Sequence, residues 1–175
     1  MAVAPFSDGT PAASQWPIPP FHFFDYEITI PLGMAGTYMY HSHVGFQAVS
    51  AMGALIISEA RPNSPPYAYD EERTIILQDV FSRNDSSIEA GLVGAPFVFS
   101  GETGMLLVNG KGGGTKNGTE CKAELSVIDV EPGKTYRLRF IGATAMSFVK
   151  LAVEGHSEFM VIEADGYIFP SLPTF

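Results

Sequence analysis

Residues 36–46 read GTYMYHSHVGF, an aromatic run that ends in two histidines separated by one serine. In a β-strand, residues i and i+2 face the same side, so His41 and His43 project together while Ser42 points the opposite way. Two imidazoles with a parallel aim on rigid backbone make half of a metal site, and imidazole suits copper, zinc, iron and nickel. The alternative is a pair of surface histidines at a strand end, each bonded to water or to a carbonyl group.

The number of ligands limits what this pair can do by itself. Structural and catalytic metal sites normally take at least three ligands from the protein. The other two histidines, His22 and His156, are distant in the sequence and have no ligand-like neighbours. The residues alone therefore leave both interpretations of the His-Ser-His pair open.

Short apolar or alternating segments, separated by turn residues, predict β-strands along most of the chain. Residues 22–30 (HFFDYEITI) alternate between apolar and polar positions, while residues 53–60 (GALIISEA) form a continuous apolar run. The single helix candidate is the short segment 87–93. Many closely spaced short strands predict an all-β sandwich or barrel. Further strands are expected at residues 36–43, 73–81, 105–111, 123–130, 134–141, 147–155 and 158–166.

Residues 61–72 (RPNSPPYAYDEE) interrupt the strand pattern with proline and charge, and predict a linker between two domains. Similar patterns stand on both sides of it, because residues 20–28 and 132–140 each begin with Pro and continue to an aromatic and two alternating apolar positions. We therefore expect the C-terminal part of a first β domain at residues 1–60 and a related second domain, truncated at its C-terminus, at residues 73–175.

The charge balance excludes some partners. The formal net charge is −9, from 10 basic and 19 acidic residues. Nucleic acids and anionic membranes both require a basic face, so we expect neither as a partner. No apolar run approaches the length of a transmembrane span. An acidic surface remains compatible with neutral or cationic partners, or with no partner at all.

Cysteine and glycosylation signals bear on the compartment. Two N-glycosylation sequons, at Asn84 and Asn117, stand in polar, turn-like stretches and favour a secreted protein. Cys121 is the only cysteine, so no disulfide forms within the chain. It is either half of a disulfide to another segment or a buried free thiol. No signal peptide is visible at the N-terminus, and neither end resembles a natural terminus, so we expect a fragment.

The flanks of the histidine pair carry a resemblance. The stretch 36–57, GTYMYHSHVGFQAVSAMGALII, resembles the second copper-binding motif of the multicopper oxidases, with Met39 where Trp is frequent. Upstream, residues 8–28 resemble the stretch that links the first two copper motifs of the family, although Phe21 departs from an expected Gly. Downstream, segments 107–112, 131–143 and 153–167 resemble the second cupredoxin domain. The likeness is to fungal laccase-like or ascorbate-oxidase-like members. The matching motif positions are Gly36, Thr37, Tyr38, Tyr40, His41, Ser42, His43, Gln47, Gly53 and residues 55–57.

This resemblance implies tandem cupredoxin-like (plastocyanin-like) Greek-key β-sandwiches, the first of them incomplete. It implies that His41 binds one copper of a type 3 pair and His43 the other, next to a type 2 copper, where dioxygen is reduced to water. Asp8 falls where the family keeps a carboxylate that assists proton delivery, and the resemblance favours this role over the alternative of an ordinary Asp-Gly turn residue. Cys121 would pair with a cysteine near the N-terminus of the family.

Several parts of such an oxidase are not found in these 175 residues. The resemblance places the type 1 and type 2 copper ligands in other motifs, so the isolated chain is expected to be inactive. The full-length protein would take electrons from a phenol, ascorbate or a metal ion and would be secreted. Two alternatives are a truncated, non-catalytic cupredoxin-like module that binds a partner or stray copper, and a β-sandwich adhesion domain with a chance His-Ser-His.

Overall fold

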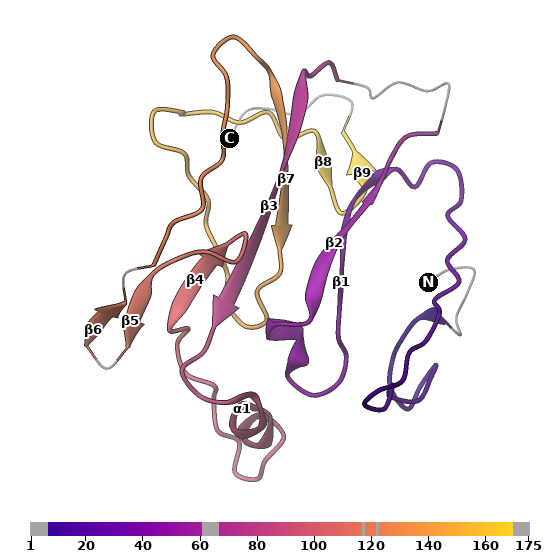
Figure 1. The fold of residues 1–175 in the computed structure, drawn as a ribbon, viewed down its shortest axis with the longest axis vertical. Coiled ribbons are helices and arrows are strands. Elements are labelled where there is room, and N and C mark those ends of the chain that lie inside the picture. The colour runs from indigo at the N-terminus through magenta and orange to yellow at the C-terminus, as the bar shows by residue number, and fades with distance from the viewer. Residues whose placement is uncertain (1–6, 61–66, 117, 122, 170–175) are drawn as a thin grey trace.

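The computed structural model describes residues 7–60, 67–116, 118–121 and 123–169 (Figure 1). Within these residues the regular structure is mostly β-strand, with one short α-helix and one 3-10 turn, which confirms the all-β prediction. No helix among them is long and apolar enough to cross a membrane. The elements in chain order are β1 (Gly36–His41), η2 (Gln47–Val49), β2 (Met52–Ile57), β3 (Glu71–Val80), α1 (Asp85–Leu92), β4 (Met105–Val108), β5 (Gly114–Lys116), β6 (Thr119–Cys121), β7 (Tyr136–Gly142), β8 (Glu163–Ala164) and β9 (Tyr167–Ile168).

The largest sheet has five strands in the order β6-β5-β4-β3-β7. β3 and β7 run parallel at one edge of this sheet, from the pair Glu71 and Tyr136 to the pair Leu77 and Gly142, and the other neighbours are antiparallel. β1 and β2 form a separate antiparallel pair beside β7, and β8 and β9 form a small hairpin (Figure 1). Segments on either side of residues 61–66 therefore lie next to one another in space.

Several predicted strands are confirmed. The apolar run 53–60 becomes β2, and segments 73–81, 105–111 and 134–141 contain β3, β4 and β7. The helix candidate 87–93 overlaps α1, whose N-cap Asn84 accepts a hydrogen bond from the backbone N–H of Ser87. The fully buried Ile88 anchors the helix to the rest of the molecule.

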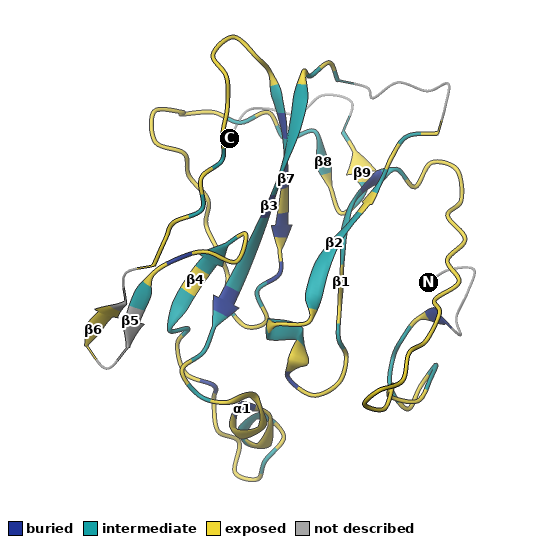
Figure 2. Ribbon diagram, viewed as in Figure 1, coloured by how far each residue is buried: buried dark blue, intermediate teal, exposed yellow. Residues whose placement is uncertain are grey.

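The strand predicted at residues 22–30 is wrong. This segment joins no sheet in the described structure, and its apolar side chains are 40–47% exposed at Phe24, Tyr26, Ile28 and Ile30 (Figure 2). Alternating apolar and polar side chains suit a segment to one face of a sheet. A strand also needs a neighbouring strand whose backbone N–H and C=O groups it can pair with. The predictions at 123–130 and 147–155 fail in the same way, and only Glu163 and Ala164 of segment 158–166 form a strand.

The interior is small and partly polar. The buried apolar side chains are Phe46, Ile75, Ile88, Ile141 and Ala143. Figure 2 shows that the buried positions concentrate on β3, β7 and the segments that adjoin them. Along β7 the buried residues alternate, so that Arg137, Arg139 and Ile141 share the inward face of the strand.

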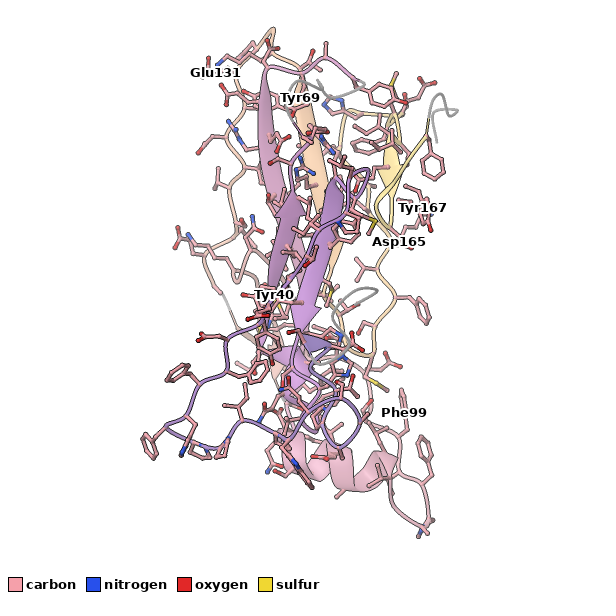
Figure 3. All side chains as sticks on the ribbon, turned by 90° about the vertical axis from the view of Figure 1, so that its right-hand side faces the viewer. Tyr40, Tyr69, Phe99, Glu131, Asp165 and Tyr167 are labelled. Carbon is pink, nitrogen blue, oxygen red and sulfur yellow. The ribbon has the colours of Figure 1, made fainter. Side chains whose placement is uncertain are left out.

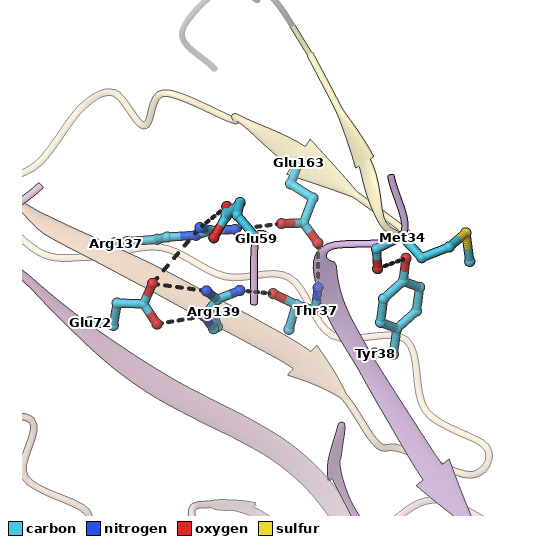
Figure 4. A network of polar contacts seen from close by, with 8 residues as sticks. All are labelled: Met34, Thr37, Tyr38, Glu59, Glu72, Arg137, Arg139 and Glu163. Carbon is cyan, nitrogen blue, oxygen red and sulfur yellow. Dashed lines mark hydrogen bonds and ion pairs between the residues drawn. The ribbon is translucent and has the colours of Figure 1, made fainter. Parts of the chain in front are cut away.

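Buried Arg137 and Arg139 centre a network of ion pairs between β7 and its surroundings (Figure 4). Arg139 Nε and Nη2 donate to the two carboxylate oxygens of Glu72 at 2.9 and 2.8 Å, and its Nη1 donates to Thr37 Oγ1 at 2.6 Å. Arg137 Nη2 donates to Glu163 Oε2 at 2.8 Å, and its Nη1 lies 3.4 Å from Glu59 Oε1. Both guanidinium groups are thus neutralised where solvent is excluded.

A buried carboxylate, that of Asp79, lies near the C-terminal end of β3. The Asp79 side chain is fully buried, and its Oδ1 accepts a hydrogen bond from the backbone N–H of Ala145 at 2.9 Å. Its Oδ2 accepts hydrogen bonds from the N–H groups of Met146 and Ser147, each at 3.0 Å. One carboxylate therefore holds the whole turn that follows β7 against β3.

Replacement of this carboxylate should destabilise the chain. In the Asp79→Asn variant the amide NH₂ faces a backbone donor, so at least one buried N–H loses its acceptor. We expect the free energy of unfolding to fall by about 1–3 kcal/mol, measured by urea denaturation followed by circular dichroism. The control is Asp25→Asn, at an exposed residue, where a change within about 0.5 kcal/mol is expected. Equal effects of the two variants would contradict the role of Asp79.

The Glu72 ion pair should contribute stability that depends on pH. The hydrogen bond from Arg139 holds the pKa of the Glu72 carboxyl below its ordinary value of 4.5. A carboxyl with a depressed pKa stabilises the fold above its unfolded pKa, and this contribution is lost as the pH falls through the folded pKa. The Glu72→Gln variant should therefore lose less stability than the wild type when urea unfolding is compared above and below pH 4.5.

Glu71→Gln is the matched control, because Lys134 likewise lowers the pKa of the Glu71 carboxyl. The cationic partners of Glu71 are about a third exposed, whereas the Arg139 side chain is only 4% exposed. High salt should therefore remove most of the effect of Glu71→Gln and less of the effect of Glu72→Gln. An identical response of the two variants to salt would refute the buried role of the Glu72 pair.

Candidate metal-binding site

The histidine pair lies where the β1–β2 pair ends. The register of β1 and β2 runs from Gly36 opposite Ile57 to His41 opposite Met52. Tyr40 stands opposite Gly53 and lays its ring over it, since a Cβ added to Gly53 would lie 2.5 Å from the Tyr40 hydroxyl oxygen. Glycine at position 53 thus leaves room for the aromatic ring that precedes the first histidine.

The structure brings the two imidazoles together. The ring centroids of His41 and His43 lie 4.4 Å apart, with 31° between the ring planes, and both side chains are exposed. β1 ends at His41, so His43 lies just beyond the strand that was expected to carry both. Ser42 turns into the following loop, where its hydroxyl donates to Gln47 Oε1 at 2.9 Å and accepts from the Val44 N–H at 3.2 Å.

The neighbourhood of His41 selects one of its two nitrogens for a metal. His41 Nδ1 lies 3.1 Å from the carbonyl oxygen of Ser42. A carbonyl oxygen can only accept a hydrogen bond, so Nδ1 carries the proton and Nε2 keeps its lone pair. A hydrogen bond of this kind fixes the tautomer and the orientation of a metal-binding imidazole. A metal at His41 would therefore bind through Nε2.

Residues in β3 and directly after it hold the loop that carries the pair. Gln78 of β3 donates a short hydrogen bond from Nε2 to the carbonyl oxygen of Val49. Phe81 meets the buried Phe46 edge to face, with ring centroids 5.6 Å apart. Figure 1 shows this loop to the right of the lower end of β3 and of α1.

A third contact comes from α1. Gly45, with a φ of +53°, lies against the Glu89 carboxylate, and a Cβ at this position would lie 2.5 Å from Glu89 Oε2. Only glycine combines this left-handed backbone with such a close approach. The loop that contains His43 is therefore held by Gln78 of β3 and by Phe81, and it lies against the helix.

The donor set fits part of a copper site. Two neutral imidazoles are ligands that copper accepts, and their rings already face one another at contact distance. Among the residues that the structure describes, no group of three or more His, Cys, Asp or Glu side chains is placed to hold a metal ion. The described residues thus bring together two imidazoles that could bind copper.

The other predicted site residues lie elsewhere. Asp8 is exposed and sits between the buried Ser7 and Gly9, whose φ is +76°. His22 places its Nδ1 2.9 Å from the carbonyl oxygen of Pro20, and His156 makes an isolated backbone bridge with Val153. The side chain of Cys121, for which we predicted a disulfide to another segment, lies outside the described residues.

Sequence reasoning did not find the residues that hold the loop. Gln78, Phe81 and Glu89 follow it in the sequence by about 30 to 45 positions, and none of them belongs to a short motif. Their role follows from tertiary contacts, for which the sequence gives no local signal. The one indication in the sequence is that Phe81, a large aromatic residue, ends the apolar segment 73–81 and could therefore pack against a neighbouring loop.

Two comparisons identify related proteins. A family model described as multicopper oxidase matches residues 71–171, and a second model with the same description matches residues 1–62. Multicopper oxidase aurL2 of Gibberella zeae is 50% identical over 93% of this chain and 27% of that protein. Laccase-like multicopper oxidase 1 of Thermothelomyces thermophilus is 43% identical over 93% of this chain and 31% of its own length. L-ascorbate oxidase of Cucumis sativus is 35% identical over 95% of this chain and 30% of its length.

Loss of the Phe81 ring should loosen the histidine loop. An aromatic pair contributes about 0.5–1.5 kcal/mol beyond its buried area, so Phe81→Ala should speed amide exchange in residues 42–51 about 2–10-fold. Hydrogen exchange followed by mass spectrometry measures this, with β7 as the internal reference for global unfolding. Phe97→Ala, at a side chain that is 63% exposed, should leave the loop unchanged. Uniform acceleration over loop and β7 would show that Phe81 does not act on the loop specifically.

Proposed function

Because the chain belongs to the multicopper oxidase family, we propose that it supplies two copper ligands, His41 and His43, to an oxidase that reduces dioxygen to water. The observation that carries this proposal is the facing pair of imidazoles on a loop held by Gln78 and Phe81. The electrons come from a small reducing substrate, of the class of phenols, ascorbate or metal ions. The chain spans about 30% of the length of the relatives named above.

Each residue of the site has a separate task. His41 binds one copper of a type 3 pair through Nε2, since its Nδ1–H is held by the Ser42 carbonyl, and His43 binds the other. Copper bound there supplies electron transfer to dioxygen. Ser42 and Gln47 keep the two rings on one side by their mutual hydrogen bond. The type 1 and type 2 ligands are assigned to parts of the protein beyond these 175 residues.

Asp8 is proposed to assist proton delivery, because reduction of dioxygen to water consumes protons as well as electrons. Its side chain is exposed, so it can exchange protons with solvent. In the full-length oxidase, Asp8→Asn should slow dioxygen reduction while the copper content stays unchanged. A normal rate in that variant would leave Asp8 as a turn residue beside Gly9.

The proposal extends to architecture and compartment. The β1–β2 pair belongs to the C-terminal part of a first plastocyanin-like domain at residues 1–60, and the five-stranded sheet to a second at residues 73–175, with 61–72 as the linker. The last two linker residues, Glu71 and Glu72, already form the start of β3, so the second domain begins at residue 71. Residues 61–66 of that linker lie outside the described part of the chain. The protein acts outside the cell, which agrees with its two sequons and its single cysteine. Cys121 forms a disulfide to a segment beyond this chain.

Copper titration with histidine variants tests the site. The wild-type chain should bind copper weakly. Loss of a residue that only hydrogen-bonds to a metal ligand typically lowers metal affinity about 10–100-fold. His41→Ala or His43→Ala removes a ligand itself, so each should lower the copper affinity by more than this. The chain offers two matched controls, His22→Ala and His156→Ala, which should bind like the wild type. Isothermal titration calorimetry and bound-metal analysis after gel filtration give the affinity and the stoichiometry.

Equal binding by all four variants would contradict the proposal. His-Ser-His would then be an inherited motif without a role in this chain, and a non-catalytic cupredoxin-like module would describe the molecule better. If only one of the two variants, His41→Ala or His43→Ala, lost copper binding, a single imidazole would be the ligand. That result would refute the paired site.

Oxygen consumption separates the chain from the complete oxidase. The copper-loaded chain should consume no dioxygen with a phenol or ascorbate beyond the rate of the same amount of free copper, because two imidazoles provide no entry point for substrate electrons. The full-length protein should be active under the same conditions. Turnover by the isolated chain, abolished by His41→Ala, would overturn the assignment of the remaining ligands to other parts of the protein.

A further inference from the structure

The sequon Asn84-Asp85-Ser86 lies at the start of α1, on an exposed corner of the molecule (Figure 1). Asn84 has extended backbone, with φ of −72° and ψ of 152°, and all three sequon residues are exposed. We infer that Asn84 carries an N-linked oligosaccharide. This inference rests on the extracellular location proposed above, because the transfer takes place on entry into the secretory pathway.

The two ends of the Asn84 amide have different tasks. Its Oδ1 accepts a hydrogen bond from the Ser87 N–H at 2.8 Å, which caps the helix. Within the described residues, Nδ2 makes no hydrogen bond. A sugar attached to Nδ2 leaves Oδ1 able to accept the same bond, so the glycan and the helix cap are compatible.

The surroundings leave the side chain accessible. Arg83, the preceding residue, folds along the helix and donates from Nη2 to the Ser87 carbonyl and hydroxyl oxygens at 2.9 and 3.0 Å. Its Nη1 reaches the carbonyl oxygen of Phe99 at 3.4 Å. Figure 3 places Phe99 beside the helix, at the opposite end of the molecule from Tyr69 and Glu131. The glycan would therefore project far from the Arg137 and Arg139 network.

The transfer balances without a redox partner. Asn84 Nδ2 forms a bond to the anomeric carbon of the first N-acetylglucosamine of a polyprenyl-diphosphate-linked oligosaccharide. The bond between that carbon and the diphosphate oxygen breaks, and the polyprenyl diphosphate leaves. Nδ2 loses one proton, which the oligosaccharyl transferase accepts. The Ser86 hydroxyl completes the sequon that this transferase recognises.

Translation of the whole chain behind a cleavable signal peptide, in the presence of microsomes, tests the site directly. Protease treatment selects the chains that entered the microsomes. Peptide N-glycosidase in heavy-oxygen water then converts each glycosylated Asn to a labelled Asp, and trypsin is added. Peptide 84–111 contains Asn84 in its only sequon, and Asn117, which lies outside the described residues, falls on the separate peptide 117–122.

We expect the labelled Asp at position 84 in the wild type and in Ser86→Thr, and no label there in Ser86→Ala. Asn84→Asp, which keeps an oxygen to cap the helix, should lose the corresponding glycosidase-sensitive shift on a gel. Absence of label at position 84 in protected wild-type chains would overturn the inference, whether or not Asn117 is labelled. Because the signal peptide supplies entry, such a failure is distinct from failure of the proposed extracellular location, which secretion of the native protein tests.

Discussion

Two guanidinium groups buried on one strand constrain most of this structure. Arg137 and Arg139 are 7% and 5% exposed, and a charge in such a place is stable only when it is paired and hydrogen-bonded. Their partners come from four separate segments (Figure 4). They are Thr37 of β1, Glu59 shortly after β2, Glu72 of β3 and Glu163 of β8. The hydrogen bonds and ion pairs of these two side chains therefore fix how the segments before residue 61 and after residue 66 meet.

The same constraint positions the histidines. Glu163 accepts a hydrogen bond from the Thr37 N–H at 2.6 Å while it pairs with Arg137, and Arg139 binds the Thr37 hydroxyl. Thr37 is four residues from His41 on one continuous strand, a span of about 13 Å. A displacement of β1 at the network would move the histidine loop against β3 and α1. The polar network and the histidine pair thus lie at opposite ends of one continuous strand.

Local patterns predicted what depends on local geometry. The strands β2, β3, β4 and β7, the helix α1 and the approach of His41 to His43 follow from spacing within a few residues. The apolar alternation at 136, 138 and 140 suggests an inward apolar face, but the arginines between them are buried instead. Acidic side chains from distant positions make that burial possible, and a sequence does not reveal such convergence. Segment 22–30 failed for the related reason that a strand requires a partner.

The exposed pair of His41 and His43 is ordered, but two imidazoles are fewer than a metal site needs. The order and the number of ligands affect copper affinity in different ways. Ordering two imidazoles costs conformational entropy, and here the contacts of Gln78 and Phe81 with the loop, together with the Ser42 carbonyl, have already restricted the backbone and one ring. What remains unfavourable is the number of ligands, which no local contact can increase. A further segment that brings more imidazoles would therefore meet a site whose backbone and first imidazole are already ordered. Copper affinity should rise with added ligands more steeply than it would for two flexible histidines in an unfolded chain.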